Sequence, residues 1–178
     1  MTTRTRTSIA LACGLLAGLA PAALAGPAVV FRGTVTRVTD GDTIHASVRG
    51  FDIVVRLLGV DTREKWPPRG PQCGGREASA RMAQLLPLGS AVTLASDPTQ
   101  SLRDRYGRYL FYVGRGSAAP GPTGSVNYRL LQEGMAEAYV FDRQHPFRYA
   151  DLYLEAMRRA RAARLGIWRL CGLRTVRS

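Results

Sequence analysis

Apolar and polar residues alternate along the segment 31–36 of this chain. Residues 31–36 read Phe-Arg-Gly-Thr-Val-Thr, and a period of two is typical of a half-buried strand. Asp40-Gly41-Asp42 is a turn signal, and the β-rich residues 43–45 follow it. A second turn at Arg49-Gly50 leads to an apolar run over 53–60. This order predicts a three-stranded meander.

Turn-rich and periodic segments alternate along the middle of the chain. Residues 61–75 contain three prolines and three glycines, so we expect a surface loop there. Residues 76–86 have helical composition with one apolar face. Residues 91–95 and 109–113 are typical of strands. The segment 114–124 is rich in Gly, Pro, Ser and Ala, which predicts a connection.

Two further helices are expected in the last third of the chain. Residues 126–132 suit a short helix that Gly134 ends. Residues 146–165 suit a longer one, because Pro146 is well placed at a helix start. Its apolar positions recur at steps of three and four: Tyr149, Leu152, Ala156, Ala160 and Ala163. Strands with one helix after the third predict an α+β fold, a five-stranded OB-fold β-barrel with three α-helices.

The first 25 residues have the layout of a secretory signal peptide. Arg4 and Arg6 precede an apolar run over 9–19, and Ala23-Leu24-Ala25 offers small residues for cleavage. The apolar run is shorter than the roughly 20 residues that a membrane span requires. We therefore expect a signal peptide over 1–25.

Cleavage would leave residues 26–178 as one domain, which we expect to be secreted or periplasmic, monomeric and without stable membrane association. Acylation of Cys13 is the alternative, although the apolar stretch continues past that residue. Cys73 and Cys171 remain after cleavage. An even cysteine count in an exported protein favours a disulfide, and two buried thiols are the alternative.

The chain has 25 Lys and Arg residues against 13 Asp and Glu residues, a formal net charge of +12. Such an excess favours polyanionic partners, chiefly nucleic acid or anionic surfaces. Lys65 is the only lysine, so the excess also fits a compositional bias towards arginine. The two histidines, His45 and His145, do not combine with cysteine in a metal-binding spacing. Charge alone makes nucleic acid a candidate partner.

Carboxylates and an arginine in the first half of the chain are candidates for chemistry. Asp40 and Asp42 flank a glycine, and both can present oxygens to a hard cation such as calcium. An ordinary Asp-Gly turn explains the same residues. Arg56 interrupts an apolar strand and needs an anionic partner, either an internal carboxylate or a bound phosphate. Asp61 ends that strand and Glu64 follows it.

A second group of polar residues lies at 104–108, which read Asp-Arg-Tyr-Gly-Arg. Arginines beside an aromatic ring suit a nucleotide, through phosphate contacts and stacking. A hairpin turn with ordinary surface charge is the alternative. Neither this group nor the carboxylates decide a function alone.

The order of the motifs resembles that of the staphylococcal-type thermonuclease family. The motifs are Asp-Gly-Asp-Thr at 40–43, Arg-Leu-Leu-Gly-Val-Asp-Thr-Arg-Glu at 56–64, and the turn at 104–108. Shorter matches lie at Glu77-Ala78, Val126-Asn127, Gly134-Met135-Ala136 and Gly166-Ile167-Trp168. The resemblance covers roughly residues 30–169. It implies a secreted bacterial nuclease that hydrolyses DNA and RNA and leaves 3′-phosphorylated products.

The resemblance also implies a calcium site. Asp42 and Asp61 would bind the ion through their carboxylates, and Thr62 through its backbone carbonyl. Asp40 would support the ion from nearby. Glu64 would act as the general base or position the attacking water.

The remaining roles fall on substrate contacts. Arg56 and Arg108 match the residues that hold the scissile phosphate. Arg105 and Tyr106 match positions that contact the terminal phosphate of the nucleotide. Tyr139 matches a tyrosine beside the nucleotide. The alternative function is that of a catalytically inactive OB-fold nucleic-acid-binding protein, and a basic protein that adheres to anionic envelope polymers is a further rival.

Three features of this chain differ from the family pattern. Arg63 stands where the family commonly has a rigid proline beside the base. Phe141 stands where the resemblance suggests a second tyrosine facing the nucleotide. The connection 114–124 is longer than usual. None of these differences removes a metal or phosphate ligand.

Overall fold

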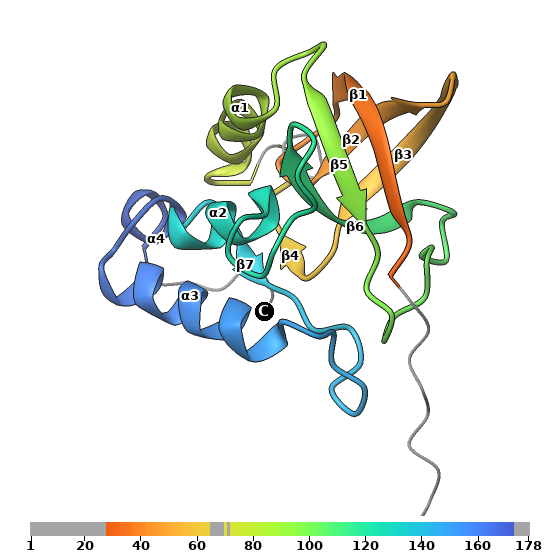
Figure 1. Ribbon diagram of the computed structural model, residues 1–178. Coiled ribbons are helices and arrows are strands. Elements are labelled where there is room, and N and C mark those ends of the chain that lie inside the picture. Colours follow the sequence, from red (N-terminus) through yellow and green to blue (C-terminus); the bar gives the residue numbers. More distant parts are fainter. Residues whose placement is uncertain (1–27, 65–69, 71, 173–178) are drawn as a thin grey trace, which may run out of the picture.

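Five strands close into a barrel in the computed structural model, which describes residues 28–64, 70 and 72–172. The helices gather on one side of the barrel, with α1 against one end of it (Figure 1). The barrel strands are β1 (Val30–Val38), β2 (Thr43–Val48), β3 (Phe51–Leu57), β5 (Ala91–Ala95) and β6 (Tyr109–Arg115). The signal peptide expected over 1–25 and part of the loop expected over 61–75 lie outside the described residues.

The barrel has the strand order β1-β2-β3-β6-β5, and β5 pairs with β1 to close it. All neighbouring strands are antiparallel except β3 and β6, which are parallel. A parallel pair needs a long crossover connection, and here the chain between β3 and β6 includes α1 and β5. The five-stranded OB-type barrel and the α+β class expected from the sequence are confirmed.

A bulge in β1 alters the alternation expected over 31–36. The register with β2 shifts between Val35 and Arg37, and a bulge of this kind adds one residue to a strand. Val35 is buried, and the next inward residue is the half-buried Val38 rather than Arg37. The period of two therefore holds only up to the bulge.

The apolar run 53–60 does not form one strand. β3 ends at Leu57, and a separate two-residue strand, β4 (Val60–Asp61), pairs with β7 (Glu137–Ala138). Gly59 makes the turn between them at φ 77°, and a Cβ there would lie 2.5 Å from the Phe147 ring. A residue with a side chain would be strained in that conformation. The turn directs Asp61 back towards the end of β3.

The helices are α1 (Gly75–Leu85), α2 (Val126–Gln132), α3 (Ala150–Ala162) and the short α4 (Ile167–Leu170). Three of them correspond to the three helices expected, and α4 is additional. The last helix, expected over 146–165, is shorter than predicted at both ends, because α3 starts at Ala150 and ends at Ala162. The residue before its N-cap, Arg148, donates its backbone N–H to the buried Asp97 carboxylate over 2.7 Å. That tertiary bond attaches the residues just before α3 to the barrel end at Asp97.

The C-terminal part of the described chain is attached at two points. Ile167 and Trp168 of α4 are buried and pack in a small cluster with Ala160. Cys171 forms a disulfide with Cys73, 98 residues earlier in the sequence. The bridge expected from the cysteine count is thus present in the structure. No helix in the described part of the chain is both long and apolar enough to cross a membrane.

Candidate active site

The turn between β1 and β2 carries Asp40 and Asp42 at the base of the site. The Thr39 N–H donates to the Thr43 carbonyl over 2.9 Å and closes the turn. A Cβ on Gly41 would lie 2.8 Å from the Thr62 Oγ1 atom and from the Ala78 Cβ atom of α1. Glycine at this position therefore lets the turn approach Thr62 closely. The Asp-Gly-Asp sequence is a turn, as one interpretation expected, and its second aspartate is buried.

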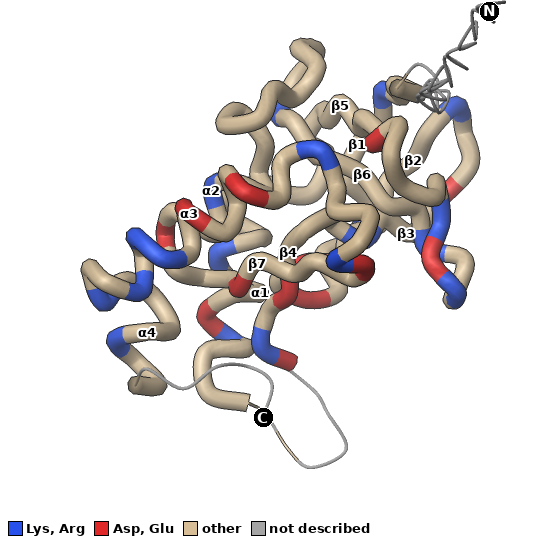
Figure 2. The backbone as a smooth tube through the Cα atoms, turned by 90° about the horizontal axis from the view of Figure 1, so that it is seen from below, with Lys and Arg blue, Asp and Glu red and all other residues tan. Residues whose placement is uncertain are grey.

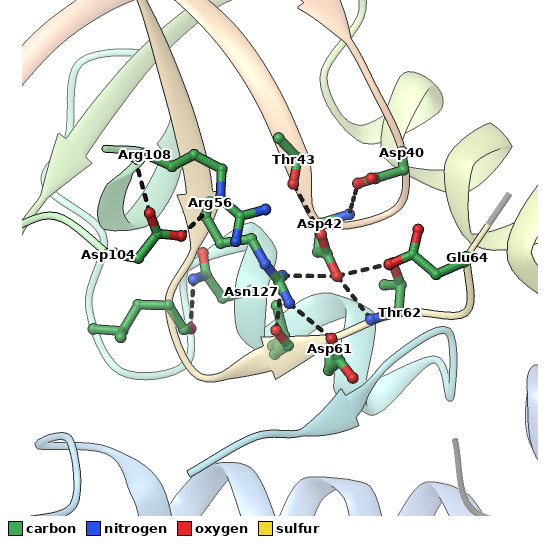
Figure 3. Close-up of polar contacts among 12 residues, drawn as sticks. Asp40, Asp42, Thr43, Arg56, Asp61, Thr62, Glu64, Asp104, Arg108 and Asn127 are labelled. Atoms are coloured by element: carbon green, nitrogen blue, oxygen red, sulfur yellow. Dashed lines mark hydrogen bonds and ion pairs between the residues drawn. The ribbon is translucent and has the colours of Figure 1, made fainter. Parts of the chain in front are cut away.

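The carboxylate of Asp42 accepts hydrogen bonds at both of its oxygen atoms. Its Oδ2 atom accepts hydrogen bonds from the Thr62 N–H at 2.8 Å and from the Thr62 hydroxyl at 3.0 Å. Its Oδ1 atom accepts one from the Thr43 hydroxyl at 3.0 Å. The side chain is 7% exposed. These bonds hold Asp42 in a single orientation (Figure 3).

Arg56 joins the carboxylates of Asp42 and Asp61. Its Nη1 atom lies 2.7 Å from Asp42 Oδ2, and its Nη2 atom lies 2.8 Å from Asp61 Oδ1. Nη1 also donates to the carbonyl of Val60 over 2.9 Å. Register explains the proximity, since Arg56 on β3 pairs with Thr43 on β2, the residue after Asp42. The internal salt bridge, one of the two partners expected for Arg56, is the one that the structure contains.

Two more carboxylates lie around this ion-pair cluster. Burial, together with the negative charge of Asp42, raises the pKa of Asp40 to about 7. Partial burial also raises the pKa of Glu64, and the charges of Asp42 and Asp61 add to that effect. Arg56 and Arg108 lower it. Acidic residues gather around α1, β4 and β7 in the view from below (Figure 2). Four carboxylates in one region favour the binding of a cation.

The donor set suits calcium, which prefers carboxylate and carbonyl oxygens. Asp42 and Asp61 supply such oxygens, and Thr62, which bonds to Asp42, lies beside them (Figure 3). Within the described residues, no three acidic, histidine or cysteine side chains are arranged as a ready metal site. Arg56 already pairs with both Asp42 and Asp61. An ion held by these carboxylates would compete with Arg56 for them.

The turn at 104–108 is organised by Asp104. Its carboxylate accepts the Arg108 Nε–H over 2.7 Å and the backbone N–H groups of Tyr106 and Arg108 over 2.9 and 3.0 Å. The Arg105 and Arg108 guanidinium groups lie 4.8 and 5.3 Å from the centre of the Tyr106 ring. Tyr106 is 67% exposed. Exposed cations around an aromatic ring form a surface that suits a phosphate and a base.

Tyr139 lies next to the pairing of β4 with β7, whereas Phe141 is exposed to solvent. The Tyr139 N–H donates to the Gly59 carbonyl over 3.0 Å, next to the pairing of Val60 with Ala138. The half-buried Tyr139 is therefore one strand away from Asp61. Phe141 is 82% exposed.

Two residues that support the site were named only within motifs in the interpretation of the sequence and received no role there. Asp104 holds Arg108, and its spacing of four residues from Arg108 is a signal that could have indicated an ion pair. Asn127 is fully buried in α2. Its side chain accepts from Val113 N–H and donates to the carbonyls of Leu58 and Phe111. It thereby attaches α2 to the turn that leads into β4.

Known proteins are similar to this chain over most of its length. The family model described as staphylococcal nuclease homologue matches residues 54–170. The thermonuclease of Staphylococcus intermedius is 34% identical over 134 residues, which are 75% of this chain and 74% of that protein. The micrococcal nuclease of Shigella flexneri is 36% identical over 141 residues, 78% of this chain and 74% of the relative.

This chain belongs to the staphylococcal nuclease homologue family. A third relative, the SPbeta prophage-derived endonuclease YokF of Bacillus subtilis, is 36% identical over 137 residues, and these make up 43% of that protein. The resemblance inferred from the motifs is therefore confirmed at the level of the family.

Proposed function

We propose that this protein is a calcium-dependent nuclease that hydrolyses phosphodiester bonds of DNA and RNA and leaves 3′-phosphorylated products. The nuclease class follows from family membership. The observation that carries the finer proposal is the cluster in which Arg56 bridges Asp42 and Asp61. It gathers the oxygens for a cation and a guanidinium for a phosphate in one place.

Asp42, Asp61 and the Thr62 carbonyl are the residues that would hold calcium, with Asp40 in support. The bound ion supplies positive charge near the scissile phosphate and offsets the charge that develops there. Asp42 is suited to such a role because Thr43 and Thr62 keep its carboxylate in place. Second-sphere contacts of this kind orient a metal ligand.

Arg56 and Arg108 would hold the phosphate. Each already has an aspartate partner in the structure: Asp42 and Asp61 for Arg56, Asp104 for Arg108. Arg56 would contact a phosphate oxygen from its place between Asp42 and Asp61. Arginine is well suited to this because its planar donors match two phosphate oxygens.

Glu64 would orient or deprotonate the attacking water. Its raised pKa makes it a stronger base than an ordinary glutamate. With water as the nucleophile, the ribose 2′-hydroxyl is not needed, so both DNA and RNA are accessible substrates. Arg105, Tyr106 and Tyr139 would contact the nucleotide. Export through the expected signal peptide, to the periplasm or the medium, is part of the same proposal.

Cleavage assays with Glu64→Gln test the enzymatic role. We expect kcat on DNA and RNA in calcium to fall about 10²- to 10⁴-fold, with 3′-phosphates on the wild-type products. Glu155→Gln is the matched control, because Glu155 lies on α3 with its side chain 41% exposed, and its partners there are Arg158 and Arg159. It should cut at the wild-type rate. Binding of nucleic acid without cleavage in calcium would favour the inactive OB-fold protein instead.

Calcium can also be tested without any substrate. An ion that binds only the folded state raises the free energy of unfolding, by about 2.7 kcal/mol at 100 times its dissociation constant. We expect calcium to raise the Tm of the wild type and to have much less effect on Asp61→Asn. An equal shift in both proteins would contradict the assignment of Asp61 as a ligand.

A further inference from the structure

Gln72 holds the main chain of Glu64 by two hydrogen bonds in opposite directions. The Glu64 N–H donates to Gln72 Oε1 over 3.0 Å. The Gln72 N–H donates to the Glu64 carbonyl oxygen over 3.0 Å. Both bonds end on the backbone from which the Glu64 side chain projects. Because that side chain is itself exposed, its backbone contacts largely determine where it can reach.

The segment that follows Gln72 is anchored to the C-terminal helix. Cys73 is bonded to Cys171, which directly follows α4. Gly74 packs against the same helix so closely that a Cβ would lie 2.6 Å from Ile167 Cγ2. Ile167 is itself fully buried. The residue after Gln72 is therefore covalently attached, through the Cys73–Cys171 disulfide, to a packed part of the fold.

Contacts on the other side of Gln72 complete the attachment. The Gly75 N–H donates to the Gln72 carbonyl over 3.0 Å, and a Cβ on Gly75 would lie 2.5 Å from the Glu64 carbonyl oxygen. The start of α1 thus packs directly against Glu64. Arg63 stands in place of a family proline. Its Nη2 atom lies 3.8 Å from the Oε1 atom of Glu137 on β7. Restraint of the backbone beside Glu64 comes here from tertiary contacts rather than from a proline ring.

We propose that Gln72 and the Cys73–Cys171 disulfide form a strap that positions Glu64, so that the rate of turnover depends on this strap. The inference rests on the proposed function, in which Glu64 acts on the attacking water. Gln72 is a positioning residue in this scheme. Loss of such a residue lowers kcat and leaves KM nearly unchanged, because the contacts of the arginines with the phosphate persist.

Steady-state kinetics of Gln72 variants on DNA in calcium test the hydrogen-bonded part of the strap. Gln72→Ala removes the acceptor for the Glu64 N–H, and we expect kcat to fall about tenfold with KM within about twofold of the wild type. Gln72→Glu keeps an acceptor oxygen at the same reach and should recover most of the rate. Gln84→Ala is the matched control, since Gln84 is exposed on α1 and its amide oxygen accepts from Arg81. It should leave both constants unchanged.

A double variant shows whether Gln72 acts through Glu64. In a Glu64→Gln background, Gln72→Ala should cause no further loss of rate, because the two changes affect one function. An equal tenfold loss in both backgrounds would overturn the inference. So would wild-type kcat in Gln72→Ala while Glu64→Gln is slow, an outcome that leaves the proposed function intact. Wild-type kcat in Glu64→Gln would instead overturn the role of Glu64 and the strap with it.

Reduction tests the covalent part of the strap. Dithiothreitol supplies two electrons and two protons, so the S–S bond becomes two thiols while the reagent is oxidised to its cyclic disulfide. Cys73 is exposed and accessible to the reagent. We expect kcat to fall in reduced wild type and to be insensitive to the reagent in a Cys73→Ser, Cys171→Ser double variant. Thiol titration shows when reduction of the wild type is complete. An unchanged kcat in that fully reduced protein would overturn the role of the disulfide.

Discussion

Arg56 and Arg108 make the same kind of contact in two different surroundings. Arg56 bridges Asp42 and Asp61 at 2.7 and 2.8 Å, and its side chain is 13% exposed. Arg108 pairs with Asp104 at 2.7 Å, and its side chain is 32% exposed. The first cluster lies between β2, β3 and β4, whereas the second is confined to one turn. Both arginines are proposed to hold a phosphate.

The difference teaches how much each arginine contributes to folding. A buried ion pair that loses one partner leaves an uncompensated charge in a poorly solvated place, which is strongly destabilising. A more exposed pair is screened by water, so its loss has little effect on stability. We therefore expect the Arg56 cluster to be needed for both stability and catalysis, and the turn at 104–108 for substrate contacts alone.

The largest effect is expected for Arg56→Leu. It leaves Asp42 and Asp61 without the guanidinium between them, and the free energy of unfolding should fall by about 3–5 kcal/mol. Urea denaturation without calcium, followed by circular dichroism, measures this loss. Arg108→Leu is the matched control and should change the free energy of unfolding by about 1 kcal/mol or less. Similar losses in the two variants would remove the distinction between the regions.

An intermediate effect is expected for Thr62→Val. The change keeps the volume of the side chain and removes the hydroxyl that donates to Asp42 Oδ2 over 3.0 Å. The free energy of unfolding should fall by about 1–2 kcal/mol, because a buried carboxylate loses one donor. Thr36→Val removes a similar bond to Asp52 on the exposed face of β1, and its cost should be about 0.5 kcal/mol or less. Equal costs would show that burial does not distinguish the two bonds.

The smallest effect on stability is expected for Tyr106→Ala, in the exposed turn. Its free energy of unfolding should stay within about 0.5 kcal/mol of the wild type. KM for single-stranded DNA should rise about tenfold through loss of stacking. Phe51→Ala, which removes a 74% exposed residue at the start of β3, should leave KM unchanged. A KM that does not change in Tyr106→Ala would remove Tyr106 from the proposed substrate contacts.

The sequence predicted correctly those helices whose first and last residues are determined by neighbouring residues in the chain. α2 begins at Val126, where the Ser125 hydroxyl accepts the Tyr128 N–H, and Gly134 follows its end at φ 67°. Its predicted range, 126–132, agrees with the structure. The predicted start of α3 at Pro146 was wrong, because the helix begins at Ala150; just before it, Arg148 donates its N–H to Asp97, 51 residues earlier in the chain. Such a partner lies beyond the reach of any periodic pattern.

The candidate site divides in the same way. The sequence alone indicated that Arg56 contacts an anion, because it interrupts an apolar strand and an isolated buried charge costs too much free energy. Which anion it meets depends on the pairing of β2 with β3 and on the turn at Gly59. Those two features bring Asp42 and Asp61 to opposite sides of the guanidinium. The role of Gln72 at Glu64 is equally tertiary, because it needs the chain to fold back on itself.

By itself, the sequence determined the family, the barrel and the residue types that the site requires, because motif order and hydrophobic period are properties of the chain. Only the tertiary structure decided how those residues are paired. Arg56 bonds to two carboxylates and Asp104 holds Arg108. Gln72 bonds to the backbone of Glu64, and the next residue, Cys73, is bridged to Cys171. Hydrogen bonds and ion pairs act over about 3 Å, and such proximity between residues distant in sequence exists only once strand register and helix packing are formed.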